Sequence, residues 1–349
     1  MSCNKRILAI FECTSQIGFG HASRSISLLR HFYTLRYQVV LLTSYESKLM
    51  LDSFSTRDFD LIIHYSLNDF LSDPLRLYNL FSPDVLLVDH YDNNIRNFLT
   101  ALSHLPITKI LFDDIASFPD YPCDVFINPN LYPSNYFVSR NCLHLIGPSF
   151  MPLREEFIDI RSYWRPSASS DDKYRCLISV GATDPFNLTT IILDKLRLYS
   201  HRNEFIFAIV LSSLAPKLQE LRTLLESVSF NLKTELLLDV RNMSALYLNS
   251  HCCIGAAGSS SWERASIGLP TAQFPIVDNQ QNIQNSLLSH GAIFNLNIPT
   301  SPLFSSQISE FLDSALTTRS DFLDLSSSSL SLGLSSGASN IVKLLSLFS

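Results

Sequence analysis

Short runs of Val, Ile, Leu and Phe recur along this chain, with segments of helical length between them. In the first half the runs are RILAIF (6–11), YQVVLLTS (37–44), DLIIHY (60–65), DVLLVDHY (84–91), TKILFDD (108–114), DVFINPN (124–130) and LHLIG (143–147). Strands that are apolar along their whole length are buried on both faces, which is typical of parallel sheets covered by helices. The first half therefore predicts a parallel α/β sheet.

The same alternation returns in the second half after a polar, turn-rich segment at 151–173. Its apolar runs are YRCLISV (174–180), EFIFAIVLS (204–212), KTELLLDV (233–240), HCCIGAAG (251–258) and PTAQFPI (270–276). The pattern predicts α/β architecture with two Rossmann-like domains and a cleft between them. The expected boundaries are a first domain at 1–155, a linker at 156–173, a second domain at 174–325, and a serine-rich loop with a terminal helix at 326–349.

The composition indicates the compartment in which such a chain works and excludes some classes of binding partner. It carries 26 Lys and Arg against 32 Asp and Glu, a net charge of −6, which argues against nucleic acid because nucleic acid prefers a basic face. No apolar stretch approaches the roughly 18 residues of a membrane span, and ILAIF is too short for the core of a signal peptide. The 7 scattered cysteines indicate free thiols in a reducing compartment. We expect a cytoplasmic monomer that binds neither nucleic acid nor membrane.

The turn after the first apolar run, IGFGHASRS (17–25), holds two glycines and a histidine. Gly18 and Gly20 stand where a positive φ or the close approach of a ligand is needed. A helix is expected from Ala22, so His21 would lie at its N-terminus beside backbone N–H groups that attract anions. The apolar residues of one face of that helix are Ile26, Leu29 and Tyr33.

Three interpretations of this turn remain open from its residues. The first is an ordinary strand-to-helix turn with an incidental histidine, and the second is a dinucleotide-binding fingerprint. The third is a turn that carries a catalytic histidine acting on an anionic substrate. The fingerprint is the weakest, because Ser23 stands where the third glycine of G-x-G-x-x-G belongs. The acidic residue that should follow the next strand comes late, at Glu46.

Two turns of the second half are candidates for lining a ligand site. In SVGATDPFNLTT (179–190), Asp184 is a natural N-cap before Pro185, whereas Ser179 and Gly181 are better placed to line the site. In GAAGSSSWERASIGLP (255–270), small residues precede a helix expected near Ser260.

The second of these turns offers groups for a phosphate. Gly255 and Gly258 let the backbone approach a ligand, and the N–H groups of Ser259, Ser260 and Ser261 can hold an anion. Glu263 stands three residues after Ser260, which is the spacing of a capping box. Spacing alone favours a cap at Glu263 over a contact with ligand.

Polar residues also follow other predicted strands. Asp89, His90 and Tyr91 stand at a carboxyl edge, and the amides of PIVDNQQNIQN (275–285) suit a sugar or a base. Asp113 and Asp114 are more often turn formers than metal ligands. The chain shows no H-E-x-x-H, no C-x-x-C and no Walker A motif, so we expect neither a metal nor a cofactor.

Taken together, these motifs resemble the UDP-2,4-diacetamido-2,4,6-trideoxy-β-L-altropyranose hydrolase family of pseudaminic acid biosynthesis. The matching stretches run in order from residue 15 to 285, with a weaker echo at SSGASNIV (335–342). They are SQIGFGHASRS, LLVDHY, ILFDDIA, LIGPSFMPLREEF, LISVGATDPFNLT, NMSAL, GAAGSSSWERASIGLP and DNQQN.

The resemblance implies a glycosyltransferase-B type of fold with UDP held by the second domain. It implies that His21 activates water, that Tyr91 and Asn279 lie near the sugar, and that Glu263 binds the uridine ribose. The turn at 258–261 would meet the diphosphate. The other residues expected to contact the UDP-sugar are Gly18, Gly20, Arg24, Asp89, Gly181, Gly258, Ser259, Ser260, Ser261 and Gln280.

The chain departs from the family pattern at several positions. Ile10 and Glu12 stand where the family usually shows an arginine and an aspartate, and a paired glycine appears as Gly181-Ala182. These departures concern which sugar the protein accepts more than which class of nucleotide it binds. The alternatives to a hydrolase are a glycosyltransferase of the same fold that uses a UDP-sugar donor and a non-catalytic nucleotide-sugar-binding protein.

Overall fold

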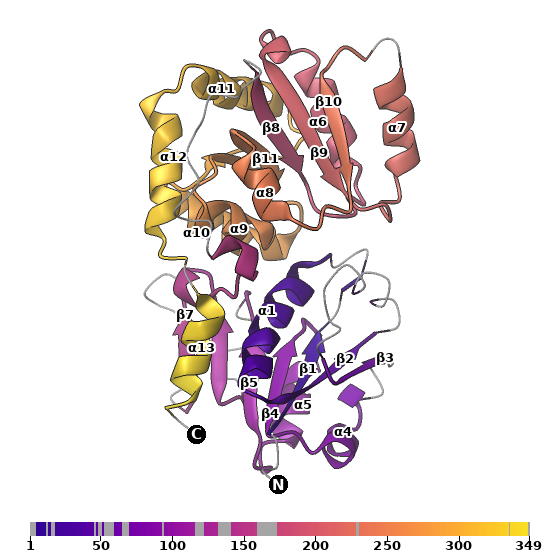
Figure 1. The fold of residues 1–349 in the computed structure, drawn as a ribbon, viewed down its shortest axis with the longest axis vertical. Helices are drawn as coiled ribbons and strands as arrows, with labels where there is room; N and C mark the ends of the chain where they lie inside the picture. Colours follow the sequence, from indigo (N-terminus) through magenta and orange to yellow (C-terminus); the bar gives the residue numbers. More distant parts are fainter. Residues whose placement is uncertain are drawn as a thin grey trace. The chain divides into compact units, whose positions relative to one another are not determined.

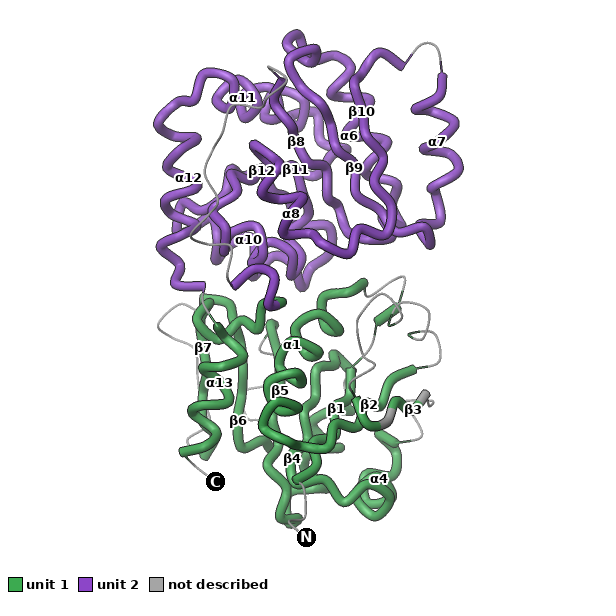
Figure 2. Tube along the Cα trace, viewed as in Figure 1, with its two compact units in different colours: residues 1–154, 335–349 green, residues 155–334 purple. Residues whose placement is uncertain are grey.

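The computed structural model of the chain divides into two compact units (Figures 1 and 2). Unit 1 comprises residues 1–154 and 335–349, and unit 2 comprises residues 155–334. Glu12, Glu46 and residues 159–172 of the predicted linker lie outside the described residues. The structure describes residues 5–11, 13–14, 18–44, 47, 51, 59–64, 70–92, 94–115, 122–131, 141–158, 173–227, 230–334 and 336–347.

Unit 1 is built on a seven-stranded sheet of order β3-β2-β1-β4-β5-β6-β7, in which all neighbouring strands are parallel. The parallel sheet predicted from the apolar runs is confirmed. Because β1 lies between β2 and β4, the winding of the chain reverses there, and the carboxyl ends of β1 and β4 flank the switch point at which open α/β sheets bind ligands. The strands are β1 (Arg6–Phe11), β2 (Gln38–Thr43), β3 (Leu61–His64), β4 (Val85–Asp89), β5 (Thr108–Phe112), β6 (Val125–Asn128) and β7 (Leu143–Ile146).

Two apolar cores cover the two faces of this sheet. Alternate residues of β1 enter opposite cores: Ala9 packs in one and Leu8 and Ile10 in the other. Helices α1 (Gly20–Thr34) and α13 (Gly337–Leu345) contribute to the first core, and α4 (Pro74–Phe81) and α5 (Ile95–Ala101) to the second. Burial on both faces explains why the strands are apolar along their whole length.

Helix α1 begins earlier than its apolar pattern predicts. Its first residue is Gly20, two residues before Ala22, so His21 lies within the first turn rather than ahead of it. Ile26 and Leu29 are buried as predicted, but Tyr33 is 42% exposed. Phe32 completes the buried face in its place, packing against the core that α1 shares with α13.

Unit 2 repeats the plan with a six-stranded parallel sheet of order β10-β9-β8-β11-β12-β13. Its switch point lies between β8 and β11, the strands that precede the two turns singled out by sequence. The strands are β8 (Tyr174–Ser179), β9 (Phe205–Leu211), β10 (Thr234–Leu238), β11 (Cys252–Ala256), β12 (Thr271–Phe274) and β13 (Phe294–Asn295). The two-residue strand β13 has no sequence signal.

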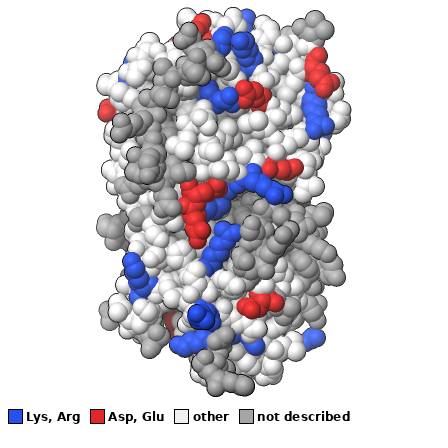
Figure 3. All heavy atoms as spheres, in the orientation of Figure 1, with Lys and Arg blue, Asp and Glu red and all other residues white. Residues whose placement is uncertain are grey.

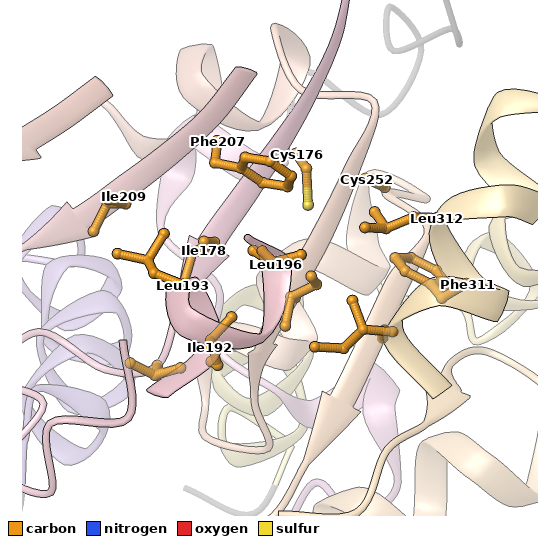
Figure 4. Close-up of a cluster of buried hydrophobic side chains, with 14 of the residues drawn as sticks. Cys176, Ile178, Ile192, Leu193, Leu196, Phe207, Ile209, Cys252, Phe311 and Leu312 are labelled. Atoms are coloured by element: carbon orange, nitrogen blue, oxygen red, sulfur yellow. The ribbon is translucent and has the colours of Figure 1, made fainter. Parts of the chain in front are cut away.

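Helices pack on this sheet over a large apolar core (Figure 4). Cys176 and Cys252 lie within that core, which agrees with cysteines that act as small apolar residues. The helices of unit 2 are α6 (Leu188–Leu196), α7 (Leu218–Glu226), α8 (Met243–Leu248), α9 (Ser260–Ser266), α10 (Gln281–Ser289), α11 (Phe304–Leu316) and α12 (Ser320–Ser331).

The serine-rich loop predicted from residue 326 is wrong for its first part, because residues 326–331 belong to α12. Serine disfavours a helix because its hydroxyl competes for backbone groups. Here Ser327 Oγ donates to the Leu323 carbonyl, one turn back, and Ser329 Oγ donates to the Ala292 carbonyl of a neighbouring segment. Contacts made in the fold therefore override the local preference.

Among the described residues, no helix combines the length and the apolar character that crossing a membrane requires. On the face drawn in Figure 3, charged side chains of both signs are interspersed among uncharged ones.

Candidate functional site

The switch point of unit 1 brings two predicted residues into contact. His21 follows β1 in the first turn of α1, and Asp89 is the last residue of β4, paired in register with Phe11 at the end of β1. His21 Nδ1 lies 2.6 Å from Asp89 Oδ1. The two residues are 68 positions apart in sequence, and the sheet order joins them.

The protonation of this pair follows from its partners. Asp89 is fully buried, and burial alone would raise its pKa, but Arg24 and His21 outweigh that effect and hold the pKa well below its usual range. An ionised carboxylate only accepts hydrogen bonds, so His21 Nδ1–H donates to it. The neutral imidazole then carries its lone pair on Nε2, which suits it to accept a proton.

Arg24 and Ser25, also from α1, hold the same carboxylate. Arg24 donates through Nε to Asp89 Oδ2 at 2.7 Å and through Nη2 to Asp89 Oδ1 at 2.6 Å, while Ser25 Oγ donates to Oδ2 at 2.9 Å. The guanidinium is 4% exposed, and it lies over the Phe112 ring, 4.9 Å from the centroid. Arg24, expected from sequence to contact substrate, is thus engaged by the protein itself.

A second carboxylate completes this cluster. Asp114, which follows β5, accepts at Oδ2 from Arg24 Nη1 at 2.5 Å and from the Tyr91 hydroxyl at 2.8 Å. The Tyr91 ring stands edge-on to the His21 imidazole, with centroids 4.6 Å apart. Burial, followed by the Asp114 charge, raises the Tyr91 pKa well above its usual value, so the hydroxyl keeps its proton. We name His21, Arg24, Asp89, Tyr91 and Asp114 the histidine cluster.

The two adjacent aspartates have different surroundings. Asp113 behaves as the turn former that sequence favoured, since its Oδ1 accepts from the Ile115 N–H. Asp114 instead pairs with Arg24, a role with no local signal because its partner lies 90 residues away. Its backbone is also held, by Asn130 Nδ2 donating to the Asp114 carbonyl at 3.0 Å.

The glycines of the turn differ as well. Gly18 has φ +79°, a conformation that strains other residues, and its N–H donates to the Thr14 carbonyl at 2.7 Å. Gly20 has no positive φ and is simply the first residue of α1. The need for a positive φ is therefore confirmed at Gly18.

The switch point of unit 2 is lined by the predicted turns. Gly181, just after β8, has φ +102° with open space where a side chain would stand. Gly258 and Ser259 follow β11 and lead into α9, which begins at Ser260 as predicted. Gln280 is next to them: its Nε2 lies 3.7 Å from the position a Cβ on Gly258 would take. Asp184 caps α6 from a distance, accepting from the Leu188 and Thr189 N–H groups at 2.8 Å each.

A buried cation supports the turn before α9. Arg264 is 1% exposed, and its Nη2 donates to the Ala256 carbonyl, to Ser261 Oγ and to Gln273 Oε1, at 2.9, 3.1 and 2.9 Å. Its Nη1 donates to Ser260 Oγ at 3.1 Å. Within the described residues these acceptors are all neutral, and no carboxylate forms an ion pair with Arg264. The turn therefore carries local positive charge although the chain is acidic; sequence analysis missed this residue.

The remaining predicted residues of unit 2 flank this turn. Glu263 is buried, and the capping box expected from its spacing does not form: the N-cap is Ser259, which places Trp262 rather than Glu263 at the third helical position. Asn279 lies in a short 3₁₀ helix (Asp278–Gln280), and its buried side-chain oxygen has no hydrogen-bond partner among the described residues. Gln280 Oε1 accepts from the Ile276 N–H at 2.9 Å.

Metal-ligating groups do not gather anywhere in the described part of the chain. No three of its His, Cys, Asp and Glu side chains are arranged to hold a metal ion. Arg24 is instead paired with Asp89 and Asp114, Arg264 donates to neutral acceptors, and Asp113 and Asp184 accept from backbone N–H groups.

The two units, each a parallel sheet with a switch point, form the glycosyltransferase-B fold. MurG of Acinetobacter baumannii superposes with a TM-score of 0.67 at 15% identity, covering 97% of this chain and 99% of MurG. MnaA of Staphylococcus aureus, solved with UDP, superposes with a TM-score of 0.68 at 14% identity, covering 99% of this chain and 96% of that one. At these identities the likeness concerns the fold alone.

Sequence comparison gives a more specific likeness. The chain is 25% identical over 294 residues to the UDP-2,4-diacetamido-2,4,6-trideoxy-β-L-altropyranose hydrolase of Campylobacter jejuni, which covers 82% of this chain and 97% of the hydrolase. It is also 25% identical over 274 residues to the uncharacterized protein MJ1062 of Methanocaldococcus jannaschii, with 76% of this chain covered. The chain spans only 54% of that relative's length. No family model matches. The resemblance predicted from the motifs is confirmed, and the chain is similar to UDP-sugar enzymes.

Proposed function

We propose that this protein hydrolyses a UDP-linked 2,4-diacetamido-2,4,6-trideoxyhexose, releasing UDP and the free sugar in the synthesis of a pseudaminic-acid-type sugar. The observation that carries the proposal is the His21–Asp89 pair at the switch point of unit 1. The similarity to the Campylobacter jejuni hydrolase supports the choice of reaction.

In the proposed reaction, His21 is the general base. Its Nε2 takes a proton from water as the water oxygen bonds to the anomeric carbon, and the bond from that carbon to the UDP oxygen breaks. The bonding electrons leave with UDP, and the imidazolium is stabilised by the Asp89 carboxylate. Such a displacement passes through an oxocarbenium-like state and inverts the anomeric configuration.

Unit 2 would bind the nucleotide. The backbone N–H groups of Gly258, Ser259 and Ser260, with the Arg264 charge behind them, suit a diphosphate. The Ser261 N–H, which sequence analysis also expected to hold an anion, instead donates to the Gly258 carbonyl at 2.9 Å. Glu263 would accept hydrogen bonds from the ribose hydroxyls. Tyr91 and Asn279 would contact the sugar, and the unpartnered oxygen of Asn279 is a suitable acceptor for a sugar hydroxyl or amide.

The test is a panel of UDP-sugars in ¹⁸O-water, with UDP and free sugar identified by mass. Label should enter the sugar and not UDP, since water attacks carbon and not phosphorus. The variant His21→Asn should lose about 10²–10⁴-fold in turnover, the usual worth of a positioned base, with unchanged UDP affinity.

Other outcomes of this experiment would lead elsewhere. Label in UDP would overturn the mechanism. Turnover only when a sugar acceptor is added would make the protein a transferase, and tight UDP-sugar binding without turnover would make it a binding protein. Near wild-type turnover in His21→Asn would move the base to another residue, with Asp89 or His90 the next to test.

A further inference from the structure

The histidine cluster carries more negative than positive charge. It holds two carboxylates, Asp89 and Asp114, and one guanidinium, Arg24, whose pKa the two carboxylates raise well above its usual value despite burial. With His21 neutral, the formal charge of these buried groups is therefore −1. When His21 accepts a proton, the formal charge becomes zero.

A buried cluster with an uncompensated charge is costly, because desolvation penalises a net charge in a low-dielectric interior. The side chains of Asp89, Arg24 and Asp114 are 0%, 4% and 8% exposed, so solvent screens them little. Protonation of the imidazole removes this cost. When His21 acts as a base, the imidazolium that forms therefore balances the formal charge of the cluster.

One carboxylate would suffice to orient the imidazole, so the second calls for its own explanation. Asp89 already makes the contact with His21 and is itself neutralised by Arg24. Asp114 receives Arg24 Nη1, whereas Asp89 receives Nε and Nη2. The same Asp114 oxygen accepts from the Tyr91 hydroxyl.

We propose that Asp114 is a positioning residue for the reaction, supplying the second negative charge that stabilises protonated His21 and fixing the Tyr91 hydroxyl beside it. This inference rests on the proposed function in that it takes His21 to be the general base. It adds a residue that the sequence motifs present only as part of a turn.

The groups around the His21–Asp89 pair come from three places in unit 1. Helix α1 contributes Arg24 and Ser25, the end of β4 contributes Asp89 with Tyr91 just beyond it, and the segment after β5 contributes Asp114. Of these, Arg24, Asp89, Tyr91 and Asp114 are the charged or titratable groups, and Ser25 only donates a hydrogen bond. Removing the charge of Asp114 while keeping its shape isolates its contribution.

The test follows the protonation of His21 directly in the full-length protein. The NMR resonance of the His21 imidazole is assigned by its disappearance in His21→Asn. The pH midpoint of its titration is then compared between wild type and Asp114→Asn. The midpoint should move to lower pH by about 0.5–1 unit in Asp114→Asn, the size of effect that a nearby charge has. Asp113→Asn, which removes the adjacent carboxylate outside the cluster, should leave it in place, and Asp114→Glu should restore it in part.

Kinetics give the second readout. Turnover should fall about tenfold in Asp114→Asn with KM nearly unchanged, and the acidic limb of the pH profile should follow the NMR midpoint. Tyr91→Phe removes the hydrogen bond to Asp114 but keeps the charge of Asp114, so it should leave the pH midpoint of the His21 titration unchanged. If Asp114→Asn does not fold, Asp114→Ser is the alternative uncharged variant.

The two proposals fail in different ways. An unmoved His21 midpoint in a folded Asp114→Asn overturns the role of Asp114 whether or not the protein is a hydrolase. A moved midpoint with wild-type turnover and an unchanged pH profile also overturns it, because the charge would then not serve the reaction. A wild type that releases no UDP from any UDP-sugar overturns the proposed function, and the inference with it.

Discussion

At the scale of single residues, the chemistry of this protein depends on pairs that local sequence does not reveal. His21 stands out because two glycines precede it, and Asp89 because it ends an apolar run. Their contact, and the Arg24 guanidinium that joins Asp89 to Asp114, arise only when β1, β4 and β5 lie side by side. The sequence predicted the residues, and the sheet order determined their partners.

The depressed pKa of Asp89 has a consequence for acid stability. Its folded pKa is lower than its unfolded pKa of about 4, so below that pH the unfolded chain binds more protons than the folded one. The stabilisation from this carboxylate is thus present above about pH 4 and is lost as the pH falls toward the folded pKa. Urea unfolding of wild type between pH 6 and pH 3 should show this decline.

The variant Asp89→Asn serves as the comparison for that measurement. It should be less stable than wild type at pH 6, because Arg24 loses one of its two carboxylate partners, and its stability should depend less on pH below 4. If the free energy of unfolding changed equally with pH in the two proteins, Asp89 would titrate normally in the folded state.

A second residue-scale prediction concerns the nucleotide. Glu263→Gln should weaken UDP binding by roughly 1–3 kcal/mol, the scale of a charged hydrogen bond, if Glu263 accepts from the ribose hydroxyls. Calorimetry with UDP measures it. Ser266→Ala, on the same helix, is the control, since Ser266 Oγ donates to the backbone carbonyl of Glu263 and leaves its carboxylate untouched. Unchanged affinity in Glu263→Gln would remove Glu263 from the nucleotide site.

At the scale of elements, the two switch points give the molecule its candidate sites. In each sheet the first strand along the chain, β1 or β8, lies between the strand that directly follows it, β2 or β9, and the strand that comes after the reversal, β4 or β11. The apolar runs predicted every strand except β13, because a buried parallel strand leaves a continuous apolar signature. The helix boundaries were predicted less well, since α1 and α12 extend into glycine and serine residues that the fold accommodates.

Strand β11 depends on a glycine where it passes the buried arginine. A Cβ added to Gly255 would stand 2.9 Å from the Ser179 carbonyl oxygen and 3.1 Å from Arg264 Cζ. Gly255→Ala should therefore lower the free energy of unfolding by about 1–3 kcal/mol, the usual cost of overpacking a core. Chemical denaturation measures the change.

Gly258→Ala provides the matched comparison for that prediction. Its added Cβ would meet only Gln280 Nε2, at an ordinary 3.7 Å, so its stability should stay near that of wild type. A Gly255→Ala protein as stable as Gly258→Ala would mean that β11 can shift away from Arg264.

At the scale of the whole molecule, the chain returns to its first unit after completing the second. Residues 335–349 belong to unit 1, where α13 packs beside α1 and contributes Ala338 and Ile341 to the core (Figure 2). Gly337, the first residue of α13, lies close to the backbone of Met151: a Cβ there would lie 2.1 Å from the Met151 carbonyl oxygen. Unit 1 is therefore complete only with the last helix of the chain.

This arrangement predicts that a change in α13 destabilises unit 1. Ile341 is fully buried, so Ile341→Ala should cost about 2–5 kcal/mol, the range for large-to-small core substitutions. Lys343→Ala, on the same helix, is the control. Hydrogen exchange should show the loss of protection in β1 and α1, whereas the strands of unit 2 should keep theirs. Equal loss in both units would contradict the division described here.

The amino-acid sequence by itself determined the fold class, the positions of the parallel strands and the turns that carry polar residues. It did so because burial on both faces and strand-to-helix turns leave local patterns in composition. The tertiary structure alone decided which of those residues meet. The ion pair of Arg24 with Asp114 and the return of α13 to unit 1 join distant segments through sheet order and packing. Such contacts depend on distance in space rather than on distance along the chain, so no local pattern records them.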